Sequence, residues 1–234
     1  AGLPVSNFGT AANKDELANV IESLGLPVFI KHPTDGYDGK AQWRLFSQED
    51  FDKLQIENWD TALLVEQKVD FLYEASIIGA RGRDGSIQLY PATRNVHEDG
   101  ILLTSYAADE SSFMEALEPA KDYIATLLSD WDYVGVLTME LFVTENGLVV
   151  NELAPRVHNS GHWTQAGASV NQFENHIRAV AGLPLAPAVI KNQSMMVNLI
   201  GVDVDYSWIG IKGLELYWYQ KSVRPGRKVG HINM

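Results

Sequence analysis

Two glutamates, Glu140 and Glu152, interrupt a pair of apolar segments within the stretch from Tyr133 to His162. The segments read as two strands joined by a tight turn, and a buried carboxylate is costly unless a cation meets it. A two-residue Asn146-Gly147 turn would put the two acids on opposite faces, whereas a three-residue Glu145–Gly147 loop makes them face each other. Facing carboxylates repel, and a divalent metal that prefers oxygen ligands, such as Mg²⁺, removes the repulsion. The alternative is two separate acids, each solvated at a sheet edge.

A polar segment, from Asn151 to His162, follows the second strand. Arg156 can bind a carboxylate-like or phosphate-like anion through paired hydrogen bonds, and His158 and Asn159 can donate to the same anion. His158 and His162 can also be read as zinc ligands, but no third nitrogen or sulfur ligand lies nearby in the sequence. A structural, hydrogen-bonded role is the alternative for each histidine.

Two strand ends hold residues suited to a nucleotide. Lys31 ends an apolar strand before a loop with two glycines, so it can reach a phosphate that the loop holds. The loop lacks the G-x-x-x-x-G-K-[ST] pattern of a P-loop, and an ordinary surface turn is the alternative. Glu66 ends another strand, and the backbone of the following Gln67–Val69 can bind an adenine edge. Glu74, within an apolar strand, can bind ribose hydroxyls.

A basic turn near the end of the chain is a further candidate site. Lys221, Arg224, Arg227 and Lys228 lie within eight residues, in a chain with 18 Lys and Arg in total, and Pro225-Gly226 can gather them. An anionic ligand is the functional interpretation, and a solvated basic loop is the alternative.

Composition limits the possible functions. A net charge of -12 argues against broad binding to nucleic acid or anionic membranes. There is no cysteine, which excludes disulfides, thiol catalysis and cysteine metal sites. No signal peptide and no apolar run of the ~20 residues of a membrane helix are visible, so we expect a cytoplasmic protein. The chain stops at Met234 inside an apparent strand, and we expect a fragment or a trimmed chain.

The hydrophobic patterning predicts a strand-rich α+β fold. We expect helices over Thr10–Leu24, with Asn13 or Thr10 as the cap and Gly25 closing it, and over Ser111–Ser129, with a kink or a late start at Pro119. A third helix is expected over Ser169–Ala181, with Val170, Phe173, Ile177 and Val180 on one face. Short strands fill the segments between them, and two parts of different character meet near Glu66–Val69.

Several motifs together resemble the N5-carboxyaminoimidazole ribonucleotide synthetases, which are ATP-grasp enzymes of purine biosynthesis. They are Lys31 with GYDGKAQW, VEQ at Val65–Gln67, NELAPRVHNSGHWT at Asn151–Thr164 and RPGRKVGH at Arg224–His231. The resemblance runs along essentially the whole chain. It implies an ATP-grasp fold of two α+β subdomains with ATP held between them. The implied parts are a small (lid) subdomain at 1–68, a large subdomain with the metal site at 69–190 and a partial C-terminal subdomain at 191–234.

The resemblance also implies the reaction and its residues. ATP and bicarbonate, with Mg²⁺, would carboxylate 5-aminoimidazole ribonucleotide to N5-carboxyaminoimidazole ribonucleotide through carboxyphosphate, in a homodimer without a nucleic-acid or membrane partner. It assigns the metal to Glu140 and Glu152. It assigns catalysis to Arg156, His158, Asn159 and Lys221, of which the first three would hold bicarbonate and carboxyphosphate and Lys221 would meet the nucleotide substrate or phosphate. It assigns ATP to Lys31, Gly36, Tyr37, Asp38, Gly39, Lys40, Ala41, Gln42, Glu66, Gln67, Lys68, Val69, Glu74, His97, Asn151 and Glu152. It assigns the nucleotide substrate to Tyr37, Asp38, Ser160, Arg224, Arg227 and Lys228.

The chain departs from the family pattern in two ways. Lys40 stands where an arginine is expected after GYDG, and lysine cannot bind an anion with the two-pronged geometry of arginine. The family's N-terminal α/β domain and longer C-terminal tail are not in the sequence, so we expect the core of a larger enzyme with little activity alone. The rival interpretations are another ATP-grasp carboxylate–amine ligase and a non-catalytic nucleotide-binding fragment.

Overall fold

The computed structural model describes residues 2–32, 42–98, 100–107 and 115–234. The chain divides into two compact units, one of Val5–Asp70 and one of Ala1–Pro4 with Phe71–Met234. The predicted loop residues Gly36–Ala41 lie outside the described residues. No helix in the described part of the chain combines the length and apolarity that a membrane crossing requires.

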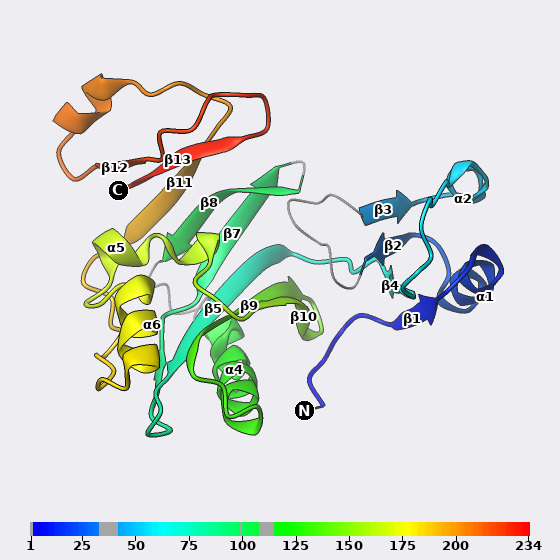
Figure 1. The fold of residues 1–234 in the computed structure, drawn as a ribbon, viewed down its shortest axis with the longest axis horizontal. Helices are drawn as coiled ribbons and strands as arrows, with labels where there is room; N and C mark the ends of the chain where they lie inside the picture. Colours follow the sequence, from blue (N-terminus) through cyan, green and yellow to red (C-terminus); the bar gives the residue numbers. More distant parts are fainter. Residues whose placement is uncertain (1, 33–41, 99, 108–114) are drawn as a thin grey trace. The chain divides into compact units, whose positions relative to one another are not determined.

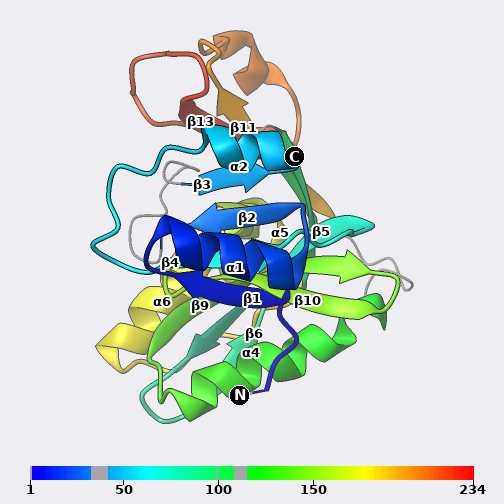
Figure 2. The ribbon, with the colours of Figure 1, turned by 90° about the vertical axis from the view of Figure 1, so that its right-hand side faces the viewer.

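The smaller unit is a four-stranded antiparallel sheet in the order β1-β4-β2-β3. Its helix α1 packs along β1 and β4 (Figure 2). The predicted cap is confirmed: Asn13 accepts from the Glu16 backbone, and Gly25 ends the helix at a positive φ of 75°. Its elements are β1 (Phe8–Ala11), α1 (Lys14–Leu24), β2 (Val28–Lys31), β3 (Gln42–Leu45), α2 (Gln48–Lys53) and β4 (Leu63–Gln67).

The larger unit is built on a nine-stranded sheet in the order β10-β9-β5-β7-β8-β11-β13-β12, with β6 paired to β5 (Figure 1). Its strands are β5 (Tyr73–Arg81), β6 (Ile87–Leu89), β7 (Thr93–Glu98), β8 (Ile101–Ala107), β9 (Gly135–Thr144), β10 (Gly147–Ala154), β11 (Ser194–Ile200), β12 (Glu215–Trp218) and β13 (Lys228–Asn233). Its helices are α4 (Glu118–Asp130), η1 (Asn159–Gly161), α5 (Thr164–Gly167), α6 (Gln172–Ala181) and η2 (Tyr206–Gly210). Mixed strands and helices confirm the α+β prediction.

The two faces of this sheet differ. One face is apolar: Ile77, Met139 and Leu141 form a cluster with Ile124 and Leu128 of α4. The residues that alternate with these on β5 and β9 point to the other face. They include Ser76 and Glu140, which are cross-strand partners. That face also holds an apolar cluster around Trp163, from the segment that leads into α5. The site residues therefore stand on the face opposite α4.

The hairpin that carries the two acids has a turn that differs from both predicted turns. Thr144 pairs with Gly147, so the turn is the two-residue Glu145-Asn146 and not the Glu145–Gly147 loop. The register then shifts by one residue between Val150 and Glu152, and Glu152 pairs with Glu140. A β-bulge places two residues of one strand opposite one of its partner. Asn151 is the extra residue, and it brings the acids together despite the two-residue turn.

The other predicted helices need smaller corrections. Residues 111–114 lie outside the described part, and α4 begins at Glu118 with Pro119 in its first turn, where a missing N–H is tolerated. Helix α6 begins at Gln172, after an Asn171 cap. Its apolar face points away from the sheet, since Ile177 is 60% exposed while Asn175 and Ala179 are buried.

Candidate functional site

The acid pair lies at the centre of the predicted site. Glu140 on β9 stands opposite Glu152 on β10, which confirms the predicted facing of the two carboxylates. The pKa of Glu140 is raised to about 7, chiefly by burial and also by the charges of Glu152 and Glu74, while His97 and Arg156 oppose the rise. A nearby divalent cation would favour the ionised form.

A third acid, Glu74, stands next to the pair on the same face. The Glu74 carboxylate on β5 lies 2.5 Å from His97 Nδ1 on β7. Burial lowers the pKa of His97, but the hydrogen bond and charge of Glu74, with the charges of Glu140 and Glu152, outweigh burial and raise it. The structure therefore brings the predicted ribose residue and its histidine together beside the predicted metal residues.

His158 connects the polar segment to the acid pair. Its Nε2 atom lies 3.6 Å from Glu140 Oε1, and its Nδ1 atom lies 2.9 Å from the Ser160 hydroxyl. The pKa of His158 is lowered to about 4, chiefly by burial and also by the charges of Arg156, His97 and Lys228. The imidazole is therefore neutral at neutral pH, and the predicted substrate residue Ser160 has its hydroxyl directed at His158.

The predicted bicarbonate residues and the basic turn meet at Asn159. The Lys228 ammonium donates to Asn159 Oδ1, which joins β13 to η1. Arg156 is exposed, and its guanidinium donates to the Val157 carbonyl oxygen at 3.0 Å. Lys221 lies over the Tyr219 ring, 5.3 Å from its centroid. Lys228 therefore reaches the polar segment.

Arg224 and Arg227 are the two arginines of the basic turn. Arg227 is half-buried and donates to the Ser222 hydroxyl at 2.7 Å. Arg224 is exposed. The sequence therefore predicted a basic cluster, of which the structure brings Lys228 alone into contact with Asn159 among the described residues.

A stack of aromatic rings beneath Lys228 was missed by sequence reasoning. His231 lies between His162, at 4.6 Å, and Tyr217, at 4.5 Å, measured between ring centroids. The Tyr219 hydroxyl lies 2.5 Å from His231 Nδ1, and Gln165 Oε1 lies 3.1 Å from its Nε2. The alternation of Tyr217, Tyr219 and His231 on neighbouring strands was the available signal, but it required the pairing of β12 with β13.

The zinc alternative for His158 and His162 gains no support from their surroundings. Gln172 Oε1 accepts from the His158 backbone N–H at 2.9 Å, and its amide nitrogen lies 3.3 Å from His162 Nδ1. The pKa of His162 is lowered to about 2, chiefly by burial and also by the charges of Lys228, His231 and His158. Hydrogen bonds to the protein therefore occupy the Nδ1 atoms of both histidines.

The smaller unit holds the remaining predicted ATP residues. The Lys31 ammonium lies 2.5 Å from Glu66 Oε2, so two of them are paired, and Gln42 is the cross-strand neighbour of Lys31. The backbone N–H groups of Gln67 and Lys68 donate to the carbonyl oxygens of Asn7 and Pro27. The chain already uses these two donors for its own hydrogen bonds.

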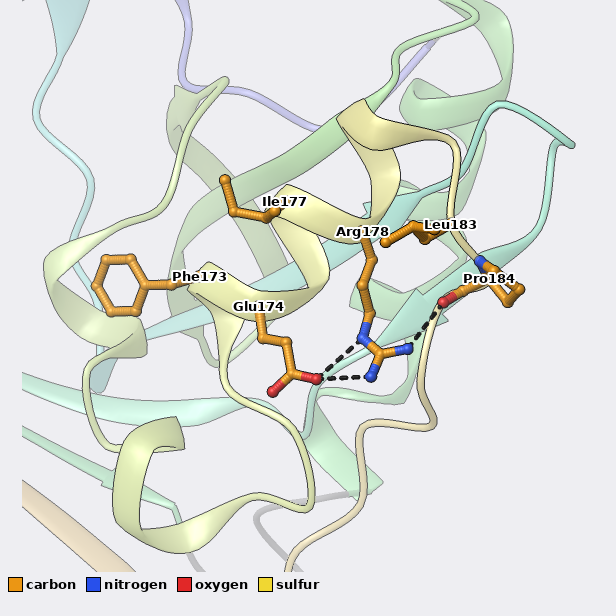
Figure 3. A pocket seen from close by; sticks show the side chains of 6 residues that line it. All are labelled: Phe173, Glu174, Ile177, Arg178, Leu183 and Pro184. Carbon is orange, nitrogen blue, oxygen red and sulfur yellow. Dashed lines mark hydrogen bonds and ion pairs between the residues drawn. The ribbon is translucent and has the colours of Figure 1, made fainter.

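A shallow apolar hollow lies elsewhere, over α6 (Figure 3). Phe173, Ile177, Leu183 and Pro184 line it, and the Glu174–Arg178 ion pair, at 2.7 Å, borders it. It shares no residue with the predicted site. Its lack of convergent polar groups sets it apart from the acid pair as a place for chemistry.

The described residues fit a magnesium ion that is shared with a phosphate ligand better than a metal held by protein alone. No group of three or more His, Asp or Glu side chains in the described part of the chain is arranged to hold a metal ion. Mg²⁺ in nucleotide sites is typically bound through one or two carboxylates, with phosphates and waters completing its shell. Glu140 and Glu152 supply such a pair of carboxylates.

Comparison with known proteins identifies two families along the chain. Residues 1–173 match the family described as ATP-grasp domain. Residues 194–234 match the phosphoribosylaminoimidazole carboxylase C-terminal domain.

Three relatives illustrate the match. The N5-carboxyaminoimidazole ribonucleotide synthase of Escherichia coli (strain K12) is 47% identical over 232 residues, which cover 99% of this chain and 64% of that protein. The crystal structure of the synthetase from Thermus thermophilus is 38% identical with a TM-score of 0.89, covering 100% of this chain and 63% of its own. The Aspergillus clavatus N5-carboxyaminoimidazole synthase, in complex with ADP and 5-aminoimidazole ribonucleotide, is 29% identical with a TM-score of 0.84. The match covers 100% of this chain and 64% of that protein.

The chain thus spans less than two thirds of the length of each of these relatives. The ATP-grasp match nevertheless covers most of the chain, and the α+β ATP-grasp fold predicted from the sequence is confirmed. The chain belongs to the ATP-grasp family, and it is similar over nearly its whole length to N5-carboxyaminoimidazole ribonucleotide synthases.

Proposed function

We propose that the protein catalyses the ATP- and bicarbonate-dependent carboxylation of 5-aminoimidazole ribonucleotide to N5-carboxyaminoimidazole ribonucleotide. A bicarbonate oxygen attacks the γ-phosphorus of ATP, ADP leaves, and the carboxyphosphate so formed releases carbon dioxide and phosphate beside the substrate amine. The amine then bonds to the carbon and loses a proton. The observation that carries the proposal is the acid pair Glu140–Glu152 standing beside His158, with Lys228 on Asn159.

The proposed ATP residues follow from the positions of charged groups. Lys31 would leave its ion pair with Glu66 and bind the phosphates instead. Its ammonium would stabilise charge on the transferred phosphoryl group. Glu74, oriented by His97, would accept hydrogen bonds from ribose hydroxyls. Gly36, Tyr37, Asp38, Gly39, Lys40 and Ala41 are proposed to cover the phosphates on the resemblance alone.

Glu140 and Glu152 would hold Mg²⁺, with Asn151 beside them. When bound, the metal supplies a positive charge that neutralises the phosphate oxygens and orients them. The chain's contribution is the bulge at Asn151, because it sets the two carboxylates opposite each other before any ligand arrives.

Bicarbonate would lie between Arg156, His158 and Asn159, within reach of Lys228. The guanidinium and ammonium groups attract the anion, and the neutral His158 imidazole can donate to it without carrying a charge of its own. Burial lowers the pKa of Lys228 to about 7, with a further contribution from Lys221, and an anion at this point would favour its charged form. Lys221, Arg224 and Arg227 would bind the phosphate of the nucleotide substrate.

We also propose a cytoplasmic homodimer. The exposed apolar residues Phe173, Ile177 and Leu183 on and after α6 support a surface that a second copy covers (Figure 3). A pair of self-complementary patches is the usual form of such a contact.

The reaction is tested by ADP release from ATP with bicarbonate and 5-aminoimidazole ribonucleotide, each added and omitted. Release should require both, and Glu152→Gln should lower it by about 100-fold or more, since a metal contact supplies several kcal/mol to phosphoryl transfer. Glu145→Gln, an exposed acid in the turn of the same hairpin, is the matched control and should retain wild-type activity. Release that follows another amine, or that survives Glu152→Gln, contradicts the proposal.

A further inference from the structure

A row of buried polar side chains runs beneath the site and ends at His158. The Ser160 hydroxyl lies 2.9 Å from His158 Nδ1, and the Ser76 hydroxyl donates to Ser160 Oγ at 2.8 Å. Behind them, the Asn95 amide nitrogen donates to Ser76 Oγ at 3.0 Å, and the Ser105 hydroxyl donates to Asn95 Oδ1 at 2.8 Å. Ser76, Asn95, Ser105 and Ser160 are each at most 3% exposed, so solvent does not compete for these bonds.

The sheet explains why these residues meet. Ser76 on β5 is the cross-strand partner of both Glu140 on β9 and Thr93 on β7, and Asn95 on β7 is the partner of Ser105 on β8. Directly opposed residues share a face, so the row continues the line of the acid pair across the sheet. Ser160 of η1 then closes onto the row from above this face.

The direction of the hydrogen bonds follows from the chemistry of Asn95. Its oxygen accepts from Ser105, and its nitrogen can only donate, so Ser76 Oγ receives that hydrogen. Ser76 gives its own hydrogen to Ser160, and the Thr93 hydroxyl, 2.8 Å from Ser76 Oγ, is then the donor in the Thr93–Ser76 pair. Ser160 gives its hydrogen to His158 Nδ1, and the Ser160 backbone N–H, 3.3 Å from the same atom, also donates. A neutral imidazole nitrogen that accepts carries no hydrogen. The hydrogen of His158 therefore stays on Nε2, the atom that faces Glu140.

We propose that Asn95, Ser76 and Ser160 are positioning residues that hold His158 as the Nε2–H tautomer, aimed as a hydrogen-bond donor toward the acid pair. The functional meaning rests on the proposed function: His158 donates to an oxygen of bicarbonate or carboxyphosphate and is not the base that takes the amine proton. Ser160 acts through His158, in place of the direct substrate contact predicted from the resemblance.

The tautomer is measured by nitrogen NMR of ¹⁵N-histidine-labelled protein without nucleotide or metal, with His158→Gln identifying the His158 signals. The wild type should show an unprotonated Nδ1 and a protonated Nε2. Ser160→Ala and Ser76→Ala should move both signals toward the average of the two tautomers. Ser194→Ala is the matched control, because Ser194 is a buried serine of the same sheet whose hydroxyl has no hydrogen-bond partner among the described residues. A protonated Nδ1 in the wild type, or unchanged signals in both variants, overturns the inference.

Kinetics separate positioning from a structural role. Ser160→Ala and Ser76→Ala should raise the KM for bicarbonate by about tenfold, the loss expected for one hydrogen bond, and leave the KM for ATP unchanged. Wild-type bicarbonate KM in both variants, or an equal rise in Ser194→Ala, overturns the inference. A wild-type protein with the predicted tautomer but no bicarbonate-dependent ADP release contradicts the proposed function alone, and the tautomer result stands.

Discussion

Burial keeps the imidazoles around Asn159 without charge. Burial is the main cause that lowers the pKa of His158 to about 4, of His162 to about 2 and of His231 to about 3, and the charge of Lys228 adds to each. Neutral rings can stack and donate side by side at little electrostatic cost, whereas three imidazolium ions could not. Arg156 and Lys228 therefore supply the positive charge of the anion site.

Lys228 carries a stability cost that depends on pH. Burial first, and Lys221 second, lower its pKa from 10.5 to about 7. Between these values the unfolded chain binds the proton and the folded chain does not, so the free energy of unfolding rises with pH across this window. Below pH 7 both states are protonated, and the full cost of the buried charge remains.

Lys228→Met should therefore stabilise the protein at low pH. We expect a gain of about 1 to 3 kcal/mol in the free energy of unfolding at about pH 6.5, and a smaller gain at about pH 9.5. Urea unfolding at the two pH values measures it, with the exposed Lys212→Met as the control. A gain that grows with pH, or a loss at pH 6.5, would contradict the assigned burial.

At the scale of elements, local signals predicted the helix ends and failed at the hairpin. Asn13 and Gly25 act within a few residues of themselves, and the structure confirms both caps. The turn was placed around Gly147 because glycine favours a positive φ, which Gly147 does adopt at 121°. The bulge at Asn151 leaves no local signal, since it is decided by the packing of two strands.

The order of the strands in the sheet could not be predicted from the sequence, and some of the site depends on it. The acids, Arg156 and His158 could be recognised because they follow one another along the chain. Ser76, Asn95 and Ser105 come from three strands, and their alignment depends on β5 lying beside β7 and β7 beside β8. Nothing in the alternation of one strand states which strand lies next to it, so the buried row could not be predicted.

The short helix η1 is held tightly against β5. A Cβ atom on Gly161 would lie 2.4 Å from Ile78 Cδ1 and 2.5 Å from Gln172 Oε1. Gly161→Ala should therefore lower the free energy of unfolding by about 1 to 3 kcal/mol, as overpacked cores do. Calorimetry measures it, and Gly210→Ala is the control, because a Cβ there meets nothing within 4 Å. Equal melting temperatures for the two variants would show that η1 can move outward freely.

The exposed apolar face of α6 is the proposed contact between two copies of the protein. The two copies proposed above would cover Phe173, Ile177 and Leu183, and Ile177→Asp puts a charge in that contact. Sedimentation should show a dimer for the wild type and mostly monomer for Ile177→Asp, because an unpaired buried charge costs on the order of several kcal/mol. Ile209→Asp, at an exposed isoleucine of η2, should remain a dimer. A monomeric wild type, or a dimer that tolerates Ile177→Asp, contradicts the surface.

We propose that the bulge at Asn151 makes one metal site from Glu140 and Glu152, which lie on two neighbouring strands. A crystal structure of the protein with ADP and Mg²⁺ tests it most directly. We predict a metal ion bound to one oxygen of Glu140, one of Glu152 and the ADP phosphates, with ligand distances of about 2.0–2.1 Å. A metal ion that contacts neither glutamate, or a nucleotide bound away from this hairpin, would contradict the account.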